Sequence, residues 1–258
     1  MASTPQIKIE IHFSSLTVDE MYLKDKNVVV IDVLRASTTI ATALANGAKE
    51  IIPVNNIESA LKIAGGLAAD VMLRAGERGG RTIQGFNLGN SPLEYTKEIV
   101  NGKSIIFMTT NGSAAIVKGR HAKNLVVASF VNLSHVVSFL KDLKEDLTII
   151  CAGKENRFCI EDTVCAGRLV NKLLSSDQID LLTDDSSSAA CMLDKNLGKN
   201  VLRLLKNSEH GKYLSEIGFA DDLEACAEID SIPVLPILSD NIIKLYSKSG
   251  KPHVTRKT

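Results

Sequence analysis

The stretch VVVIDVLRASTTIATALA, residues 28–45, begins with a run of β-branched residues and ends in small residues compatible with a helix. A continuous β-branched run is typical of a strand that is buried on both faces of a parallel sheet. Residues 38–45 are predicted to form a helix. A buried strand that passes through a short polar turn into a helix is the repeating unit of α/β proteins, so this stretch predicts the fold class.

The same order recurs at residues 104–113, SIIFMTTNGS, where hydroxyl side chains and a glycine follow an apolar run. The N-terminus of a helix offers free backbone N–H groups and the positive end of the helix dipole, which together bind anions. The first stretch adds a carboxylate, Asp32, and a guanidinium, Arg35. A carboxylate can hold Mg²⁺, and an arginine can bind a phosphate or sulfonate through two hydrogen bonds. The two stretches together predict a site for a small, highly anionic molecule.

Outward from these stretches, strands and helices alternate along most of the chain. Alternating or continuous apolar runs predict further strands at residues 7–13, 50–54, 71–73, 125–129, 147–151 and 234–238. Helical patterns cover residues 57–67, 161–174, 186–205, 211–217 and 221–227, and Ser91-Pro92 is predicted to open one more, with serine as its cap. The expected fold is a three-layer α/β/α arrangement around a mixed, largely parallel sheet.

The chain is interpreted as a single α/β domain, residues 1–258. Residues 48–59 and 122–135 resemble each other weakly, and each segment follows one of the two strand–turn–helix stretches. An internal duplication, with similar subdomains at about 1–100 and 101–258, is therefore a hypothesis, and generic α/β sequence patterns are the alternative.

Composition excludes several classes of function. Thirty basic and thirty acidic residues give zero net charge, and there is no tryptophan and no basic run, so nucleic-acid binding is not expected. No apolar stretch reaches the length of about 18 residues that a membrane span needs, and no secretory signal is recognised. Five cysteines without CxxC spacing are interpreted as reduced thiols, which indicates a cytoplasmic protein. Association into a homo-oligomer is left open.

Asp32 is the first candidate for chemistry because it lies at a strand end, where α/β proteins bind ligands. Two structural roles are the alternatives for Asp32: its carboxylate could cap the helix that starts near Ser37, or it could form an ion pair with Arg35. Glu161 and Asp162 begin a predicted helix, where the dipole alone favours acidic residues. If both lie near Asp32, the three carboxylates could hold Mg²⁺, which prefers oxygen ligands.

Three further segments allow two interpretations each. Glu77 and Arg78 lie in a loop rich in glycine and asparagine, and they could bind metal and anion or pair with each other at the surface. Cys151 to Arg157 matches the Cys-x5-Arg pattern of cysteine-dependent phosphatases, and a buried structural cysteine is the alternative. Asp184-Asp185 is predicted to cap the helix entered at Ser186. The five histidines show no zinc spacing and none is assigned a role.

Together these segments are similar to the 2-phosphosulfolactate phosphatase family. The matching pieces are residues 31–38, 76–78, 85–86, 90–92, 109–113 and 151–162, and the pattern from Asp221-Asp222 to Pro233 extends the match. The resemblance implies an α/β/α fold of its own type and a Mg²⁺-dependent phosphomonoester hydrolase. It implies the conversion of (2R)-2-phospho-3-sulfolactate to 3-sulfolactate and phosphate, a step toward coenzyme M.

The resulting hypothesis assigns a role to each candidate residue. Asp32, with Glu161 or Asp162, would hold Mg²⁺ against the phosphate, and Glu77 would be a metal ligand or a general base. Electrostatic stabilisation of the phosphoryl group would come from Arg35 and Arg78, and from hydrogen bonds of two turns, Ser37-Thr38 and Thr110-Asn111-Gly112-Ser113. Water, Asp32 or Cys151 could attack phosphorus. Outside enzymes, the alternative is a sensor or carrier that binds a small anion without catalysis.

Overall fold

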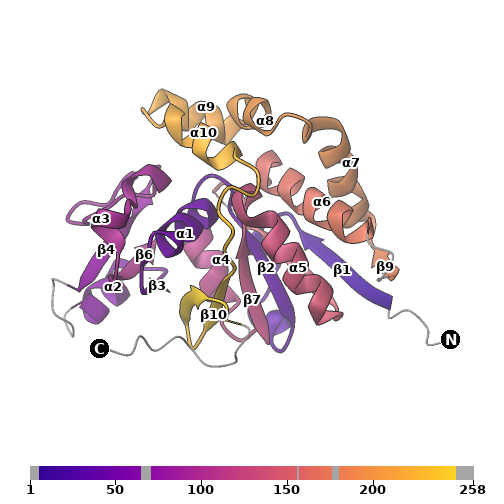
Figure 1. The fold of residues 1–258 in the computed structure, drawn as a ribbon, viewed down its shortest axis with the longest axis horizontal. Helices are drawn as coiled ribbons and strands as arrows, with labels where there is room; N and C mark the ends of the chain where they lie inside the picture. The colour runs from indigo at the N-terminus through magenta and orange to yellow at the C-terminus, as the bar shows by residue number, and fades with distance from the viewer. Residues whose placement is uncertain (1–5, 65–70, 156, 176–179, 248–258) are drawn as a thin grey trace.

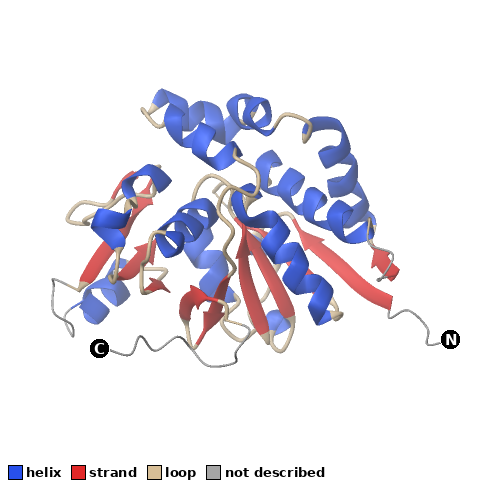
Figure 2. Cartoon of the chain, in the orientation of Figure 1, coloured by secondary structure: helices blue, strands red, loops and turns tan. Residues whose placement is uncertain are grey.

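The computed structural model describes residues 6–64, 71–155, 157–175 and 180–247, which form one α/β unit around an eleven-stranded sheet (Figures 1 and 2). The strands are β1 (Gln6–His12), β2 (Asn27–Ile31), β3 (Glu50–Pro53), β4 (Met72–Arg78), β5 (Arg81–Thr82), β6 (Ser104–Met108), β7 (Asn124–Ala128), β8 (Leu147–Cys151), β9 (Asp180–Thr183), β10 (Pro236–Ser239) and β11 (Ile242–Leu245). The helices are α1 (Ala36–Ala45), α2 (Ile57–Ala64), α3 (Lys97–Val100), α4 (Gly112–Lys118), α5 (Leu133–Leu143), α6 (Ile160–Leu174), α7 (Asp185–Leu197), α8 (Val201–Asn207), α9 (Glu209–Glu216) and α10 (Ala220–Ala227).

The sheet is mixed and largely parallel, as predicted. Its strand order is β5-β4-β6-β3-β11-β10-β7-β2-β8-β1-β9. One parallel group contains β4, β6 and β3, and a second contains β7, β2, β8, β1 and β9. The antiparallel hairpin β10–β11 joins the two groups by pairing with β7 on one side and β3 on the other.

The three-layer arrangement follows from the alternation of side chains along the buried strands. In β2, Val29 and Ile31 point into one core, which also contains apolar residues of α5, α6 and α7. Val28 and Val30 point into a second core, with residues of α1 and α4. Because successive side chains of a strand lie on opposite faces, one continuous apolar run serves both helical layers.

Strands from both halves of the sequence interleave in this sheet. β6 lies between β4 and β3, and β8 lies between β2 and β1. A division into subdomains at about residue 100 therefore does not follow the strand order, and the internal duplication is not confirmed.

Three helices near the C-terminal end of the chain, α8, α9 and α10, form a cap, residues 201–227. Figure 1 shows this cap above the ends of the central strands, close to the start of α1. Two hydrogen bonds connect the cap to the loops that follow β2 and β4. The Arg35 side chain donates to Asp222, and the Tyr213 hydroxyl donates to the Gly79 carbonyl. The cap therefore covers the edge of the sheet where the sequence predicts the site.

Two predicted helices are wrong in detail. The single helix expected at 186–205 is two helices, because Asn200 caps α8 through a hydrogen bond from the Arg203 N–H (2.9 Å). Ser91-Pro92 opens only a 3₁₀ turn, Pro92–Glu94, and the Ser91 hydroxyl donates to Asp222 (2.6 Å) instead of capping it.

The strand predicted at 71–73 is too short: β4 continues to Arg78 because its later residues pair with β6 and β5, so Glu77 and Arg78 lie in a strand and not in the predicted loop.

Most other predicted boundaries agree closely. Asp184 caps α7 by accepting from the N–H of Ser187, and the predicted strand 147–151 is β8. The helix predicted at 57–67 is described as α2 up to Ala64, and its remaining residues lie outside the described part of the chain. β11 was not predicted.

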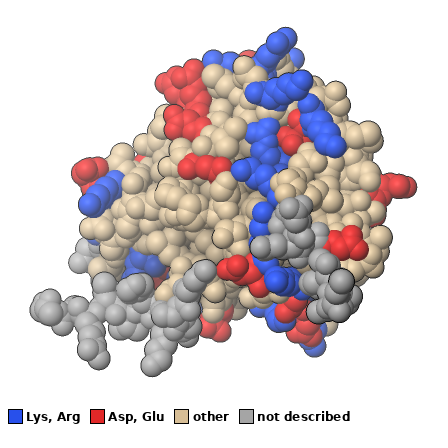
Figure 3. Space-filling model, turned by 45° about the vertical axis from the view of Figure 1, so that its right-hand side comes forward, with Lys and Arg blue, Asp and Glu red and all other residues tan. Residues whose placement is uncertain are grey.

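No helix among the described residues is long and apolar enough to cross a membrane. Figure 3 shows basic and acidic side chains interspersed on the face it presents, in keeping with the zero net charge.

Candidate active site

A cleft of about 100 Å³ lies where β2, β4 and β6 end, beneath the cap. Asp32, Arg35, Glu77, Thr110 and Asn111 line it, and all five are residues that the sequence predicts for the site. A second cavity of about 170 Å³ adjoins it and contains Glu161 in its wall. The topology therefore brings together side chains from three strand ends.

Unpaired polar atoms mark these two cavities. Five buried side-chain atoms of the described residues have no hydrogen-bond partner, and four of them belong to residues that line the cavities. These four are Oδ1 of Asn90, Oγ1 of Thr110, Oδ1 of Asn111 and Oε1 of Glu161. A buried polar atom without a partner is costly, so their convergence indicates a place where a ligand or ion completes the hydrogen bonding.

Asp32 is buried directly after β2, in the turn before α1. Its Oδ1 accepts from the N–H of Ala36 at 3.1 Å, and its Oδ2 faces Gly112 of the neighbouring unit. Burial raises the pKa of the Asp32 carboxyl to about 6, against the lowering effects of the His210 charge and of the Ala36 N–H. The site thus contains a carboxylate whose charge is poorly compensated by the protein alone.

The hydroxyls of the first turn are engaged within the protein. Oγ of Ser37 accepts from the Asp32 N–H at 2.9 Å. Oγ1 of Thr38 donates to the Val33 carbonyl at 3.0 Å and lies 2.8 Å from Oγ of Ser129. Neither residue is among those that line the cleft, so both side chains fix the turn and do not point at a ligand.

The second turn divides into two parts. Thr110 and Asn111 line the cleft with unpaired oxygens. Gly112 packs on Asp32, and a Cβ at this position would lie 2.5 Å from Oδ2. Ser113 is buried, and its hydroxyl donates to the Val54 carbonyl at 2.8 Å.

Arg35 is held in a fixed position at the cleft. Its Nη1 donates to Oδ2 of Asp222 in the cap at 2.6 Å, and its Nη2 donates to the Gly80 carbonyl at 2.7 Å. The guanidinium also lies over the ring of Phe219, 4.3 Å from its centroid. A buried arginine with three anchors presents its charge without further loss of rotamer entropy.

Glu77 and Arg78 are neighbours in the sequence, but only the side chain of Glu77 reaches the cleft. Glu77 is buried, and its two carboxylate oxygens accept from the N–H groups of Thr110 (2.7 Å) and Gly80 (2.8 Å). Glu77 therefore ties the loop after β4 to the loop after β6. Arg78 is exposed and is not among the residues that line either cavity. The alternative, a Glu77–Arg78 pair, is not formed, because both carboxylate oxygens of Glu77 accept backbone N–H groups.

Asp162 and Glu161 begin α6, and both are buried. Oδ1 of Asp162 accepts from the Val33 N–H at 2.8 Å, and Oδ2 accepts from the Gly153 N–H at 3.0 Å. Burial, together with the charges of Asp32 and Glu161, holds the pKa of the Asp162 carboxyl well above its usual range. Oε1 of Glu161 has no hydrogen-bond partner and lies 3.4 Å from Nδ1 of His210.

The donor set suits a magnesium ion only in part. Asp32 faces the cleft, and Oε1 of Glu161 is buried without a hydrogen-bond partner, 3.4 Å from Nδ1 of His210, so both fit as ligands. Asp162 fits poorly, because both of its oxygens already accept backbone N–H groups. The described residues contain no group of three or more His, Cys, Asp or Glu side chains that could hold a metal by themselves. Mg²⁺ commonly uses one or two carboxylates with water and phosphate oxygens, so two protein ligands are compatible with it.

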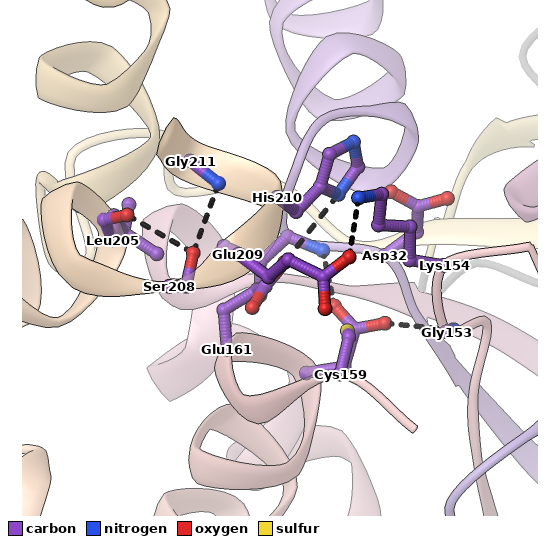
Figure 4. A network of polar contacts seen from close by, with 12 residues as sticks. Asp32, Gly153, Lys154, Cys159, Glu161, Leu205, Ser208, Glu209, His210 and Gly211 are labelled. Atoms are coloured by element: carbon purple, nitrogen blue, oxygen red, sulfur yellow. Dashed lines mark hydrogen bonds and ion pairs between the residues drawn. The ribbon is translucent and has the colours of Figure 1, made fainter. Parts of the chain in front are cut away.

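Long-range packing adds residues that the sequence did not indicate. His210 and Tyr213 of α9, Asn90 and Lys154 all line the cleft, and Asp222 of α10 anchors Arg35. Figure 4 shows Lys154, His210 and Glu161 close to one another around Glu209. Asn90, Lys154 and Asp222 belong to segments that support the family resemblance, but His210 has no spacing signal in the sequence.

The Cys151 thiol is a poor candidate for the nucleophile. Its side chain is fully buried, and burial followed by the nearby charge of Asp162 raises the pKa of the thiol well above its usual range. Arg157, the second residue of the Cys-x5-Arg pattern, is exposed and pairs with Glu155. This arrangement agrees with the alternative of a buried structural cysteine.

Comparison with known proteins agrees with this geometry. The family model of 2-phosphosulpholactate phosphatase matches residues 12–241. A protein of Caldanaerobacter subterraneus named "Probable 2-phosphosulfolactate phosphatase" is 40% identical over 228 residues, which cover 88% of this chain and 94% of the relative. Proteins with the same name are 42% identical in Thermotoga maritima (85% and 92% covered) and 34% identical in Clostridium beijerinckii (92% and 99% covered). The chain belongs to the 2-phosphosulfolactate phosphatase family.

Proposed function

We propose that the chain is a phosphomonoester hydrolase that converts (2R)-2-phospho-3-sulfolactate to 3-sulfolactate and phosphate in the presence of Mg²⁺. The observation that carries the proposal is the cleft itself, where Asp32 and Arg35 lie beside unpaired oxygens of Thr110 and Asn111. Its position at the carboxyl ends of parallel strands is typical of ligand sites in α/β proteins. A step in coenzyme M biosynthesis would be the corresponding pathway.

Each polar group has a role in this proposal. Arg35, fixed by Asp222, neutralises the phosphate oxygens as charge develops on them. Asp32 and Glu161 would hold the metal, which would supply positive charge against the phosphate oxygens when bound. The Thr110 hydroxyl, which has no partner among the described residues, donates to a phosphate oxygen, whereas Oδ1 of Asn111 is an acceptor and fits a water molecule or the metal.

Burial and sequence reduce the set of candidate nucleophiles that could attack phosphorus. Cys151 is poorly suited because its thiol is buried and stays protonated. Asp32 lacks the second aspartate of haloacid-dehalogenase-like phosphatases, since Leu34 stands two residues later. Water is therefore the nucleophile that we favour.

Five free buried cysteines agree with a reducing compartment, so we propose the cytoplasm as the location.

The test is phosphate release from 2-phosphosulfolactate with Mg²⁺ or with EDTA, beside a panel of other phosphomonoesters. The proposal expects Mg²⁺-dependent release that is selective for the sulfonated substrate. Release from other esters alone would keep the hydrolase and reject the substrate. A folded protein that binds 3-sulfolactate in calorimetry but releases no phosphate from any ester would favour the sensor or carrier.

A further inference from the structure

Lys154 is a cation of the cleft that the mechanism above does not use. It follows β8, and its Nζ donates to Oε1 of Glu209 at 2.8 Å. The Lys154 side chain is 18% exposed, whereas that of Glu209 is 79% exposed. The ammonium group therefore belongs to the cleft, and the largely exposed Glu209 carboxylate accepts its hydrogen bond (Figure 4).

Lys154 also lies where the two cavities meet. The cleft that contains Asp32 and the cavity that contains Glu161 share Lys154 and His210 in their walls. The ring of Tyr213 lies 5.3 Å from Nζ, a distance at which an aromatic face attracts a cation. A molecule bound at Asp32 and extending toward the second cavity passes this ammonium group.

The number of cations limits how a substrate with several anionic groups can bind. Arg35 and Lys154 are the lysine and arginine side chains that line the cleft; Arg157 lines the second cavity, but it is exposed and paired with Glu155. Two donor groups of Arg35 are already used by Asp222 and by Gly80, and its position beside Asp32 matches the phosphate. A second anionic group at a distance from the phosphate then requires a second cation.

We propose that Lys154 binds the sulfonate of the substrate and that Glu209 occupies this position in the free protein as an internal carboxylate. The inference rests on the proposed function, because it assigns the sulfonate of that substrate. An exposed carboxylate leaves an ammonium group at little cost, since water solvates it well. The pair thus holds Lys154 in the binding orientation and yields to a ligand that is fixed at a second point by its phosphate.

The experiment compares two substrates that differ only at the sulfonate, 2-phosphosulfolactate and 2-phospholactate. Lys154→Gln is expected to raise the KM for 2-phosphosulfolactate by about 10- to 100-fold, because a charge-assisted contact is lost, and to change the KM for 2-phospholactate less than about threefold. Glu209→Gln is expected to lower the KM for the sulfonated substrate a few-fold, by about the strength of an exposed pair. Lys154→Arg should keep most of the preference.

Equal losses with the two substrates in Lys154→Gln would overturn the assignment, because Lys154 would then serve the phosphate or the fold. An unchanged KM for the sulfonated substrate would overturn it as well. Calorimetry with 3-sulfolactate gives a readout without turnover, and weaker binding to Lys154→Gln is expected there too. A wild-type protein that neither hydrolyses nor binds these compounds would reject the proposed function and this inference together, whereas an active wild type with an indifferent Lys154 rejects the inference alone.

Discussion

The two strand–turn–helix units, β2–α1 and β6–α4, share a hydrogen-bond pattern but differ in charge. In the first unit the Asp32 N–H donates to Oγ of Ser37 at 2.9 Å. In the second the Thr109 N–H donates to Oγ of Ser113, also at 2.9 Å. The return bonds run from the Ala36 N–H to the Asp32 carboxylate and from the Ser113 N–H to the Thr109 hydroxyl. A similar turn, with the serine five residues on in the first unit and four residues on in the second, is thus built around a carboxylate in one unit and a hydroxyl in the other.

This difference indicates that the turn is a scaffold and that the side chain at its first position decides the chemistry. Reciprocal side-chain bonds satisfy N–H groups that a helix start leaves open, and a threonine does this as well as an aspartate. Only the aspartate adds a buried charge whose pKa is raised. The units meet where Gly112 of α4 packs on Asp32, so the uncharged unit forms part of the wall around the charged one.

Removing the negative charge of Asp32 should have the largest effect on kcat. Asp32→Asn keeps the shape of the side chain and its bond to Ala36 but removes the charge that holds the metal, so we expect kcat to fall by about 10³-fold. The matching change in the other unit, Thr109→Val, should lower kcat less than about tenfold, as expected for a scaffold position. Steady-state phosphate release with saturating Mg²⁺ measures both, and similar losses in the two variants would contradict the comparison.

The contact between the units gives the next largest effect. Gly112→Ala adds a methyl group that would lie 2.5 Å from both Oδ2 of Asp32 and Cβ of Ala36, so the carboxylate must move. A displacement of this kind costs about 100-fold in kcat. The control is Gly119→Ala at the other end of α4, where the new Cβ meets the side chain of Leu125. We expect this control to lose stability and keep kcat; a Gly112→Ala enzyme with full activity would disprove the role of the contact.

The charge should also lower the stability of the metal-free protein. Because the pKa of Asp32 is raised from 3.8 to about 6 in the folded state, folding favours the protonated form. The free energy of unfolding is therefore expected to fall as pH rises from about 4 to about 6, and the full penalty, about 3 kcal/mol, persists above that range.

The Asp32→Asn variant has no carboxylate to ionise, so its free energy of unfolding is not lowered at neutral pH. In EDTA it should be more stable than the wild type at pH 7.5 and closer to it at pH 4.5, as measured by urea unfolding. Adding Mg²⁺ should stabilise the wild type more than the variant, because the ion binds the folded carboxylate. A variant that is less stable at both pH values would mean that Asp32 is a structural cap.

The two serines should behave alike despite the difference in charge between their units. Each accepts a backbone N–H in a buried turn, so Ser37→Ala and Ser113→Ala should each cost about 1–3 kcal/mol of stability. We expect both variants to keep kcat within about threefold, because neither hydroxyl faces the cleft. A rise in KM for Ser37→Ala alone would instead restore Ser37 to substrate binding.

The sequence predicted the fold where local pattern decides it. β-branched runs gave β2 and β8, and apolar periodicity gave α6 to within one residue of its start. The hairpin β10–β11 could not be predicted as the link between two parallel groups, because its position depends on pairing with distant strands.

The residues of the site likewise fall into those that local sequence predicts and those that only long-range packing places there. Asp32 and Arg35 could be predicted because both lie in the turn after a buried strand. His210 could not, because packing of the cap brings it to the cleft from more than 170 positions away, with no motif of its own. The directions of Ser37 and Thr38 were also inaccessible, since a hydroxyl after a strand bonds equally well to backbone or to ligand.

Arg78 gives the smallest expected effect and separates sequence pattern from geometry most cleanly. It was predicted beside Arg35 as a partner of the phosphate, yet Arg35 is buried with three anchors and Arg78 is exposed outside the cleft. Arg78→Gln should therefore change kcat/KM less than about threefold, as for an ordinary surface substitution, whereas Arg35→Gln should lose about 100-fold or more. The salt dependence of KM provides the second measurement. If Arg78 attracted the substrate only through the field of the whole protein, its removal would raise KM at low ionic strength and leave it unchanged at 0.5 M salt, because charges separated by more than about 10 Å are screened there. A loss that persists at high salt would require direct contact and would mean that the end of β4 moves Arg78 into the cleft.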